Sequence, residues 1–121
     1  MKLGRKITGG KYIKGKKKKK YNIPGQKRIV KLSKEEKRKN KRTRGGKKKT
    51  FLLKGKLINV LDKNKKTKKL EIKNVLETPS NRFLARQNVL TKGTIVETEL
   101  GKVRITNRPT QEGMINGVLI E

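Results

Sequence analysis

The segment containing Gly10, Gly15 and Lys16 is the first whose residue types and spacing could support chemistry. It matches GxxxxGK, the opening of the loop that binds nucleotide phosphates through backbone N–H groups and a lysine. The next place of that loop should be the Ser or Thr that holds magnesium, and here it is Lys17. No apolar strand precedes the segment and no long apolar helix follows it. We therefore attribute the match to chance in a stretch rich in Gly and Lys, and expect no small-molecule substrate.

Residues suited to acid–base, nucleophilic or metal chemistry are scarce. The chain has no His and no Cys, which removes the usual zinc ligands, thiol nucleophiles and neutral-pH proton carriers. Glu97 and Glu99 lie two apart and would share one face of a strand, where Lys102 and Arg104 across the next turn make them surface ion-pair partners. The sequence predicts no enzyme, no metal site and no cofactor.

Positive charge is the dominant feature of the sequence. Lys and Arg number 37 against nine acidic residues, for a net charge of +28. A chain this basic repels itself and is expected to bind a polyanion, because each cation that meets a phosphate releases condensed counterions. Gly9, Gly10, Gly45 and Gly46 lie beside these cations and would let the backbone approach sugar and phosphate closely.

The aromatic residues limit the kind of nucleic acid that can be bound. Two Tyr and two Phe are too few for a platform that reads single-stranded bases by stacking. Tyr12 and Tyr21 stand alone in polar sequence, and we expect each to stack on a base or sugar. Phe51 and Phe83 are expected to be core residues.

Charge and apolar residues are distributed in opposite directions. Residues 1–50 hold 23 Lys or Arg and two Glu, whereas residues 51–121 hold 14 Lys or Arg and seven acidic residues. Of the 36 apolar residues, 10 lie in the first 50 positions. We predict a basic extension with little regular structure over 1–50 and a small β-barrel domain over 51–121. Without a membrane-length apolar run or a secretory signal, the protein is expected to be intracellular, with no membrane partner.

From Phe51 onward, short segments of β character predict a mainly β, closed or nearly closed antiparallel barrel. These segments are 50–62, 69–77, 94–100, 102–106 and 117–121, with 82–90 open between helical turn and strand. The apolar phase shifts at Val75–Leu76, which indicates a bulge, and Gly101 marks a hairpin. The run at 117–121 is typical of a strand covered on both sides or closing a barrel.

Two short elements are predicted before Phe51. Residues 29–32 favour a short strand. Ser33 and Glu36 have the spacing of a capping box, which predicts a helix of about two turns through Lys41. The alternative is a basic loop in which Glu35 and Glu36 relieve charge repulsion, and the sequence leaves both open.

Several stretches resemble the eukaryotic and archaeal-type small-subunit ribosomal protein eight family, which is distinct from the bacterial protein of the same number. They are GRKITGGK (4–11), RTRGGKKK (42–49), LTKGTIVETELGKVRI (90–105) and ITNRPTQEGMINGVLIE (105–121). The resemblance covers most of the chain in the same order, and its last block is the most specific. The short length and the VLIE ending are similar to archaeal members.

The resemblance implies a small β-barrel with a basic extension lying in small-subunit ribosomal RNA, in the cytoplasm. It places Thr8 with the extension, and Lys92–Gly93, Gly101 and Pro109 in turns of the barrel. Lys47 stands where the family usually has Asn, so a phosphate contact from Lys47 would replace the hydrogen bond that the Asn side chain makes in the family. The lysine run at 16–20 also departs from a more Arg-rich pattern, which argues against bidentate recognition there.

We therefore expect a structural constituent of the small ribosomal subunit with ribosomal RNA and neighbouring ribosomal proteins as partners. A DNA-compacting or architectural protein is the alternative, although no wedge residue or basic helical face is evident. The residues expected to contact RNA are Arg5, Lys6, Gly9, Gly10, Lys11, Lys14, Lys16, Lys17, Lys18, Lys19, Lys20, Lys27, Arg28, Arg38, Arg42, Arg44, Gly45, Gly46, Lys47, Lys48, Arg82, Arg86 and Arg108.

Overall fold

The computed structural model describes residues 4–12 and 15–120, and its regular structure is mainly β. The strands are β1 (Lys31–Leu32), β2 (Lys37–Arg42), β3 (Lys48–Gly55), β4 (Leu57–Leu61), β5 (Thr67–Glu71), β6 (Asn74–Glu77), β7 (Ile95–Thr98), β8 (Gly101–Ile105) and β9 (Asn116–Leu119). In the described residues, helical structure is limited to α1 (Arg82–Arg86) and the short segments η1 (Lys20–Asn22) and η2 (Arg44–Gly46). The mainly β class predicted above is confirmed. None of the described helices is long and apolar enough to cross a membrane.

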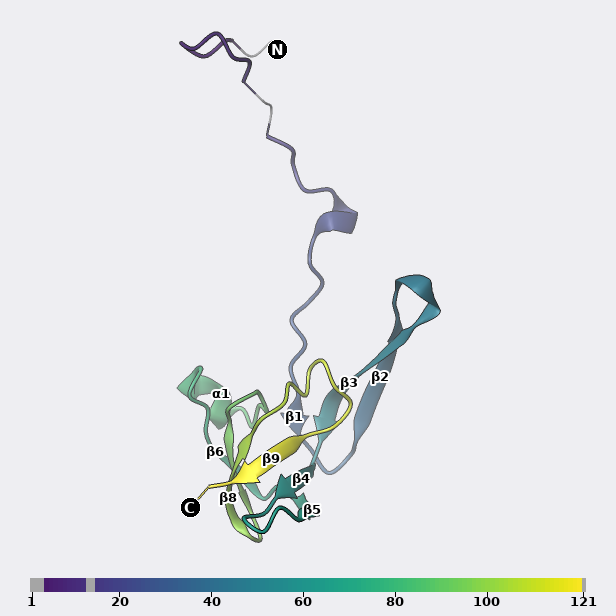
Figure 1. Cartoon of the computed structure of the whole chain (residues 1–121), viewed down its shortest axis with the longest axis vertical. Coiled ribbons are helices and arrows are strands. Elements are labelled where there is room, and N and C mark those ends of the chain that lie inside the picture. The colour runs from purple at the N-terminus through teal and green to yellow at the C-terminus, as the bar shows by residue number, and fades with distance from the viewer. Residues whose placement is uncertain (1–3, 13–14, 121) are drawn as a thin grey trace.

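The strands form two sheets (Figure 1). The larger sheet has the order β5-β4-β9-β8-β7-β6 and curls into a half-barrel, and the smaller sheet has the order β1-β3-β2. Pairing is antiparallel except between β4 and β9 and between β1 and β3. The β2–β3 hairpin projects from the larger sheet, and the described residues before β1 carry no strand of either sheet.

One hydrophobic core serves both sheets. Along β4, Ile58 and Val60 are fully buried while Leu57 and Leu61 are 37% and 40% exposed, which is the alternation of a strand with one face inward. The core consists of Val30, Leu52, Ile58, Val60, Ile72, Val75, Leu90, Val96, Val103, Ile105 and Ile115. Leu52 lies in β3 of the smaller sheet, and Val30 directly precedes β1. Because both belong to this core, the smaller sheet is packed on the half-barrel.

Gly117 lets β9 pack closely between β4 and β8. A Cβ atom on Gly117 would lie 2.5 Å from Val103 Cγ1, 2.9 Å from Ile58 Cδ1 and 3.0 Å from the Arg104 carbonyl oxygen. Real Cβ atoms do not approach this closely, so any side chain would displace β8 or β4. The absence of a side chain therefore sets the spacing between these strands.

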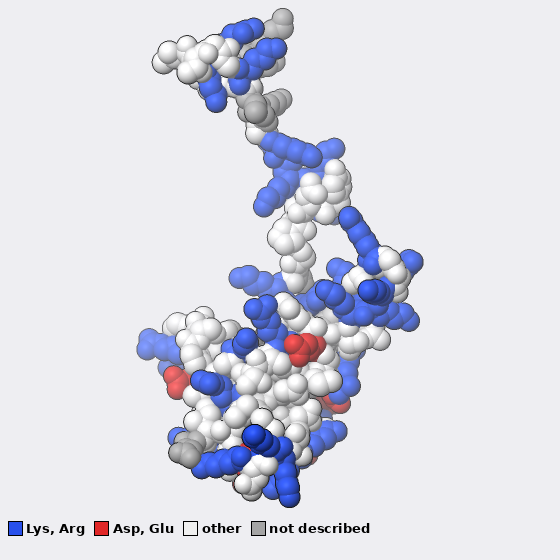
Figure 2. All heavy atoms as spheres, in the orientation of Figure 1, with Lys and Arg blue, Asp and Glu red and all other residues white. Residues whose placement is uncertain are grey.

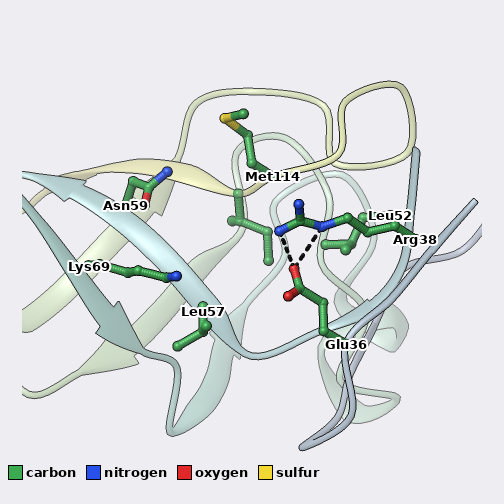
Figure 3. A pocket seen from close by; sticks show the side chains of 8 residues that line it. Glu36, Arg38, Leu52, Leu57, Asn59, Lys69 and Met114 are labelled. Atoms are coloured by element: carbon green, nitrogen blue, oxygen red, sulfur yellow. Dashed lines mark hydrogen bonds and ion pairs between the residues drawn. The ribbon is translucent and has the colours of Figure 1, made fainter. Parts of the chain in front are cut away.

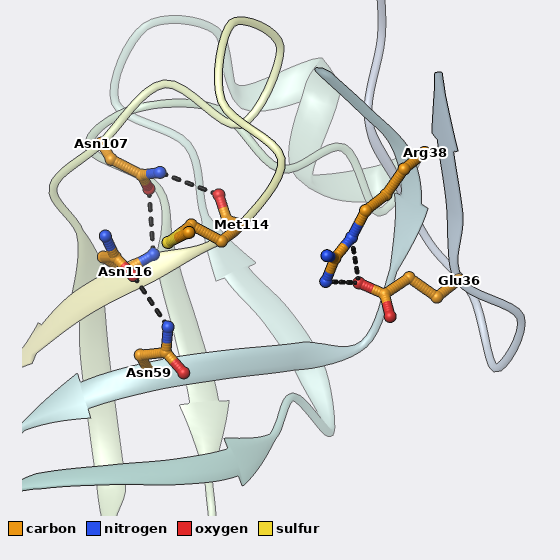
Figure 4. Close-up of polar contacts among 6 residues, drawn as sticks. All are labelled: Glu36, Arg38, Asn59, Asn107, Met114 and Asn116. Carbon is orange, nitrogen blue, oxygen red and sulfur yellow. Dashed lines mark hydrogen bonds and ion pairs between the residues drawn. The ribbon is translucent and has the colours of Figure 1, made fainter. Parts of the chain in front are cut away.

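The long loop between β8 and β9 is held by three asparagines (Figure 4). Asn107 Nδ2 donates to the Met114 carbonyl oxygen at 2.8 Å, and Asn107 Oδ1 accepts from the Asn116 N–H at 3.0 Å. Asn107 Nδ2 also donates to Glu112 Oε2 at 2.8 Å. Asn59 Nδ2 on β4 donates to Asn116 Oδ1 at 3.0 Å. These bonds fix the loop against β9 and thereby fix the position of Glu112.

Several local predictions are confirmed. The predicted bulge appears as a register shift between Val75 and Glu77 in the β6–β7 pairing. The predicted hairpin joins β7 to β8, with Thr98 opposite Gly101. Residues 82–90, left open between helix and strand, contain α1.

The predicted helix at 33–41 is wrong, and so is the alternative that this whole segment is a loop. Residues Lys37–Arg42 form β2, which pairs with β3. Glu36 accepts hydrogen bonds from the Arg38 guanidinium, and Glu35 lies 3.8 Å from Lys54 Nζ. Strand β3, whose Phe51 and Leu52 are buried, pairs its backbone groups with β2, and this long-range pairing overrides a weak local helix preference.

Two predicted burials are also wrong. Phe83 is 55% exposed, because α1 turns Ala85 toward the core and residues two apart on a helix lie on nearly opposite sides. The run at 117–121 was expected to be a strand covered on both sides or one closing a barrel; β9 lies between β4 and β8, and Val118 is 41% exposed, so the first alternative is wrong. Glu121, part of the predicted strand, lies outside the described residues.

Replacing Gly117 with Ala should destabilise the fold by about 1–3 kcal/mol, because the new methyl overpacks the core. Urea denaturation followed by far-UV circular dichroism would measure the loss. Gly25→Ala is the matched control, since a Cβ there meets nothing within 4 Å. Equal unfolding midpoints for the two variants would contradict the tight packing at Gly117.

Candidate nucleic-acid interface

The β2–β3 hairpin carries a dense run of positive charge. Between residues 37 and 49, nine of 13 residues are Lys or Arg and none is acidic. Every residue of β2 is exposed. Figure 2 shows blue side chains gathered over this hairpin and over the residues before β1, with few red ones in this view.

Strand pairing brings like charges together at the outer end of the hairpin. Lys41 lies opposite Lys49, and Arg42 lies opposite Lys48. Like charges directly across two strands destabilise the pairing. Closer to the core, Thr50 Oγ1 donates to Asn40 Oδ1 at 2.7 Å and supports the hairpin. A polyanion that neutralises the outer end would therefore stabilise the hairpin itself.

The tip of this hairpin exposes bare backbone. Gly45 and Gly46 have φ angles of 81° and 77°, a region that favours glycine, and nothing lies within 4 Å of the place where their Cβ atoms would be. The Thr43 N–H and hydroxyl both donate to the Lys47 carbonyl oxygen, at 2.7 and 2.9 Å, and close the turn. A sugar or phosphate can therefore reach the backbone between Arg44 and Lys47.

A second turn with the same Gly-Gly-Lys sequence lies near the amino terminus. The Lys6 N–H donates to the Gly10 carbonyl oxygen and the Gly9 N–H donates to the Lys6 carbonyl oxygen, both at 2.8 Å. Arg5 and Lys11 form an isolated bridge that closes this turn. The two segments that echo each other in sequence thus both form hydrogen-bonded turns with exposed cations.

Of the remaining predicted residues in the first 28 positions, those that the structure describes are exposed. Lys16 to Lys19 lead into η1, which begins at Lys20, and Lys19 Nζ lies 5.9 Å from the Tyr21 ring centroid. Tyr12, 53% exposed, is similarly placed beside Lys6. Both tyrosines are open to a partner, and their predicted stacking stays a prediction. Lys14 lies outside the described residues.

Arg28 joins the basic segment to the folded body. Its guanidinium carbon lies 3.9 Å from the ring centroid of Phe51, which is only 6% exposed. Such a stack fixes the guanidinium plane and leaves its N–H groups for other partners. Open grooves of about 480 and 430 Å³ lie on two sides of this stack, the first reaching Lys49 and the second reaching Lys39.

Sequence reasoning missed three lysines that share this face. In β2 and β3, Lys39 lies opposite Phe51 and Lys41 lies opposite Lys49, so these four side chains project from one face of the hairpin. Arg38, Arg42 and Lys48, which were predicted, project from the other face. Residues 37–50 contain no Val, Ile, Leu, Met or aromatic residue, so no apolar alternation in the sequence marked this face.

Arg38 has a protein partner that sequence reasoning did not assign (Figure 3). Its Nε and Nη2 atoms donate to Glu36 Oε1 at 2.9 and 2.5 Å. The pair lines a pocket of about 160 Å³ together with Leu57, Lys69 and Met114. Part of the Arg38 charge is therefore already compensated within the protein.

Three predicted arginines lie away from the hairpin tip. Arg82 and Arg86 lie on α1 and line one cleft beside β6. Arg108 is exposed in the β8–β9 loop, where its carbonyl oxygen accepts from the Gln111 and Glu112 N–H groups. The structure thus brings together Arg42, Arg44, Gly45, Gly46, Lys47 and Lys48 at the hairpin tip, and places Lys27 beside Arg28 at its base.

Within the described residues, no group of three or more His, Cys, Asp or Glu side chains is placed to hold a metal ion. The arrangement offers cations, exposed backbone and stacked aromatic surface, which are the groups that bind a phosphate backbone.

Comparison with known proteins gives a consistent result. A model of the family described as ribosomal protein S8e matches residues 1–120. The small ribosomal subunit protein eS8 of Nanoarchaeum equitans is 47% identical over 118 residues, covering 97% of this chain and 92% of that protein. The eS8 proteins of Staphylothermus marinus and Methanosarcina barkeri are 46% and 41% identical over 118 residues, covering 97% of this chain and 92% and 94% of those proteins.

Changing Lys39, Lys41 and Lys49 together to Gln should weaken binding to a structured RNA fragment and lower the salt dependence of the affinity. Loss of three phosphate contacts reduces the slope of log K against log salt by about two to three. Filter binding at several salt concentrations would measure it.

The matched control changes Lys65, Lys66 and Lys92, which lie in exposed turns of the larger sheet, to Gln. The same fall in slope for both triple variants would show that only net charge matters and would contradict a specific hairpin face.

Proposed function

The chain belongs to the ribosomal protein S8e family, and from this we propose that it is a structural constituent of the small ribosomal subunit that binds ribosomal RNA. Its relatives carry the name of a small-subunit protein and align with nearly the whole chain. The observation that carries the RNA role is the concentration of cations on the hairpin and on the residues before β1. The role is architectural and involves no catalysis.

Two basic projections would act together in the subunit. The residues before β1 and the β2–β3 hairpin meet at the Arg28–Phe51 stack, so an RNA helix can contact both. Structured RNA is recognised mostly through shape, phosphates and sugar hydroxyls, which suits Lys and Arg side chains and exposed glycine backbone. Ribosomal RNA would supply the countercharge that the protein lacks.

We also infer that the half-barrel is closed, or nearly so, by one continuous segment. Strand β5 pairs with β4, and strand β6 pairs with β7 at the other end of the sheet. Between them, the Ile72 N–H donates to the Lys56 carbonyl oxygen at 2.8 Å and the Lys73 N–H donates to the Glu97 carbonyl oxygen at 2.9 Å. A segment bonded to both ends of a sheet is what closes small barrels.

The proposed division into an RNA-facing part, 1–50, and a barrel domain, 51–121, describes function and not folding. Val30 is fully buried and β3 runs through residue 50, so the chain from Val30 onward packs as one unit. Residues 4–12 and 15–29 are exposed. We propose that the residues before Val30 form an extension that RNA surrounds. Strand β2 and the hairpin tip would also contact RNA, but they belong to the folded unit.

The proposed function is tested by determining which particle the protein co-sediments with. A tagged copy expressed in an archaeal host should sediment with small subunits through a sucrose gradient, and should remain with them at moderate salt. Co-migration with chromatin after ribosomes are removed would instead favour the DNA-compacting alternative.

Deleting residues 1–26 should leave the barrel folded and weaken assembly. The deletion removes 10 of 37 Lys and Arg residues but no described core residue. Far-UV circular dichroism should retain the β signal, while recovery of the variant in small subunits falls. Loss of the β signal would contradict the separation between extension and core.

A further inference from the structure

A cleft between α1 and β6 has features that phosphate neutralisation alone does not explain. Its volume is about 480 Å³, within the range of about 300–1,000 Å³ found for small-ligand clefts. Figure 1 shows α1 lying beside β6 on the larger sheet, away from the β2–β3 hairpin. The lining includes Asn74, Val75, Leu76, Arg82, Arg86 and Asn88.

The charge of the cleft suits one phosphate. Arg82 and Arg86 are four residues apart on α1 and therefore project from the same side of the helix. No acidic residue lines the cleft, so both guanidinium groups are available to an anion. The Arg82 guanidinium carbon also lies 5.5 Å from the ring centroid of Phe83, which keeps this side chain beside an exposed aromatic surface.

The lining of the cleft is mainly polar, and Leu76 and Ala85 contribute apolar surface to it. Leu76 is the residue at the β6 bulge, and its side chain is 42% exposed, whereas its neighbour Val75 is buried in the core. A bulge re-aims the side chain that it carries. Together with Ala85, Leu76 offers the cleft a surface against which a flat apolar group can pack.

The carboxamides of Asn74 and Asn88 also line the cleft, and backbone hydrogen bonds fix the main chain of Asn88. Asn88 has a φ angle of 52°, which is uncommon outside glycine but tolerated by Asn. Its backbone carbonyl oxygen accepts from the Leu32 N–H at 2.9 Å, and its backbone N–H donates to the Ala85 carbonyl oxygen at 3.0 Å. A carboxamide donates and accepts, so it can pair with the edge of a nucleobase.

We propose that this cleft binds a single unstacked nucleotide, with its phosphate on Arg82 and Arg86, its base against Leu76, and the base edge on Asn88. Because the ligand is a nucleotide of ribosomal RNA, the inference rests on the proposed function and adds a specific site to it. Unstacked bases in loops and bulges are the parts of RNA that proteins read by sequence.

Methyl NMR of the full chain would test the ligand chemistry at constant salt. Titration with adenosine monophosphate should shift the methyl signals of Val75, Leu76 and Ala85. Ribose 5-phosphate, which lacks the base, should bind at these methyls about tenfold more weakly, because the apolar surface that the base buries against Leu76 and Ala85 is lost. Equal affinities for the two probes, or shifts absent from these methyls, would overturn the proposal.

Two variants assign the parts of the site. Arg86→Ala should weaken the adenosine monophosphate affinity about tenfold through loss of a charged hydrogen bond. Asn88→Gly keeps the left-handed backbone and removes only the carboxamide, so it should reduce the difference between the two probes without unfolding β1. The exposed Arg104 on β8 provides the control, and Arg104→Ala should change neither affinity.

The occupant in the assembled particle can be identified separately. A photoreactive amino acid in place of Leu76 should cross-link to ribosomal RNA in purified small subunits. A cross-link to another ribosomal protein would assign the cleft to a protein partner and overturn the proposal, while the protein's presence in the subunit would leave the proposed function standing. Absence from the subunit would instead count against the proposed function.

Discussion

Repulsion among Lys and Arg side chains constrains every part of this structure outside its core. A small half-barrel must hold a chain of net charge +28, and its strands place cations directly opposite each other at the end of the β2–β3 hairpin. The hydrophobic core can tolerate this because 12 of the 37 Lys and Arg residues precede Val30, every residue of β2 is exposed, and the buried core residues are apolar. Bound phosphate groups would neutralise these cations, so the same charges that repel one another would contribute to RNA affinity.

The Arg28–Phe51 stack lies where these two regions meet. Phe51 is nearly buried at the base of the hairpin, and the guanidinium above it is the last cation before the chain enters the core at Val30. The stack therefore relates the direction of the preceding segment to the hairpin face that carries Lys39 and Lys49. Packing of one aromatic ring thus positions charges from two distant parts of the sequence.

The α1–β6 cleft illustrates a different use of the same fold. It lies beside a bulge, a short helix and a left-handed Asn, three local irregularities in an otherwise regular sheet. Bulges and unusual backbone conformations persist where surrounding structure determines them, and they are frequent at binding sites. Regular strands support the general phosphate surface, while the irregular segment supplies the shape for one nucleotide.

Composition and local pattern were sufficient for the β class, the bulge at Val75–Glu77, the hairpin at Gly101 and the basic character of residues 1–50. These features depend on charge, period-two alternation and the position of glycine, all of which can be recognised from residues close together in the sequence. The strand at Lys37–Arg42, the exposure of Phe83 and the common face of Lys39, Lys49 and Phe51 did not follow. Each depends on which strands pair and on which side chains pack into the core. These contacts join residues far apart in the sequence and outweigh local preference, so only the tertiary structure determines them.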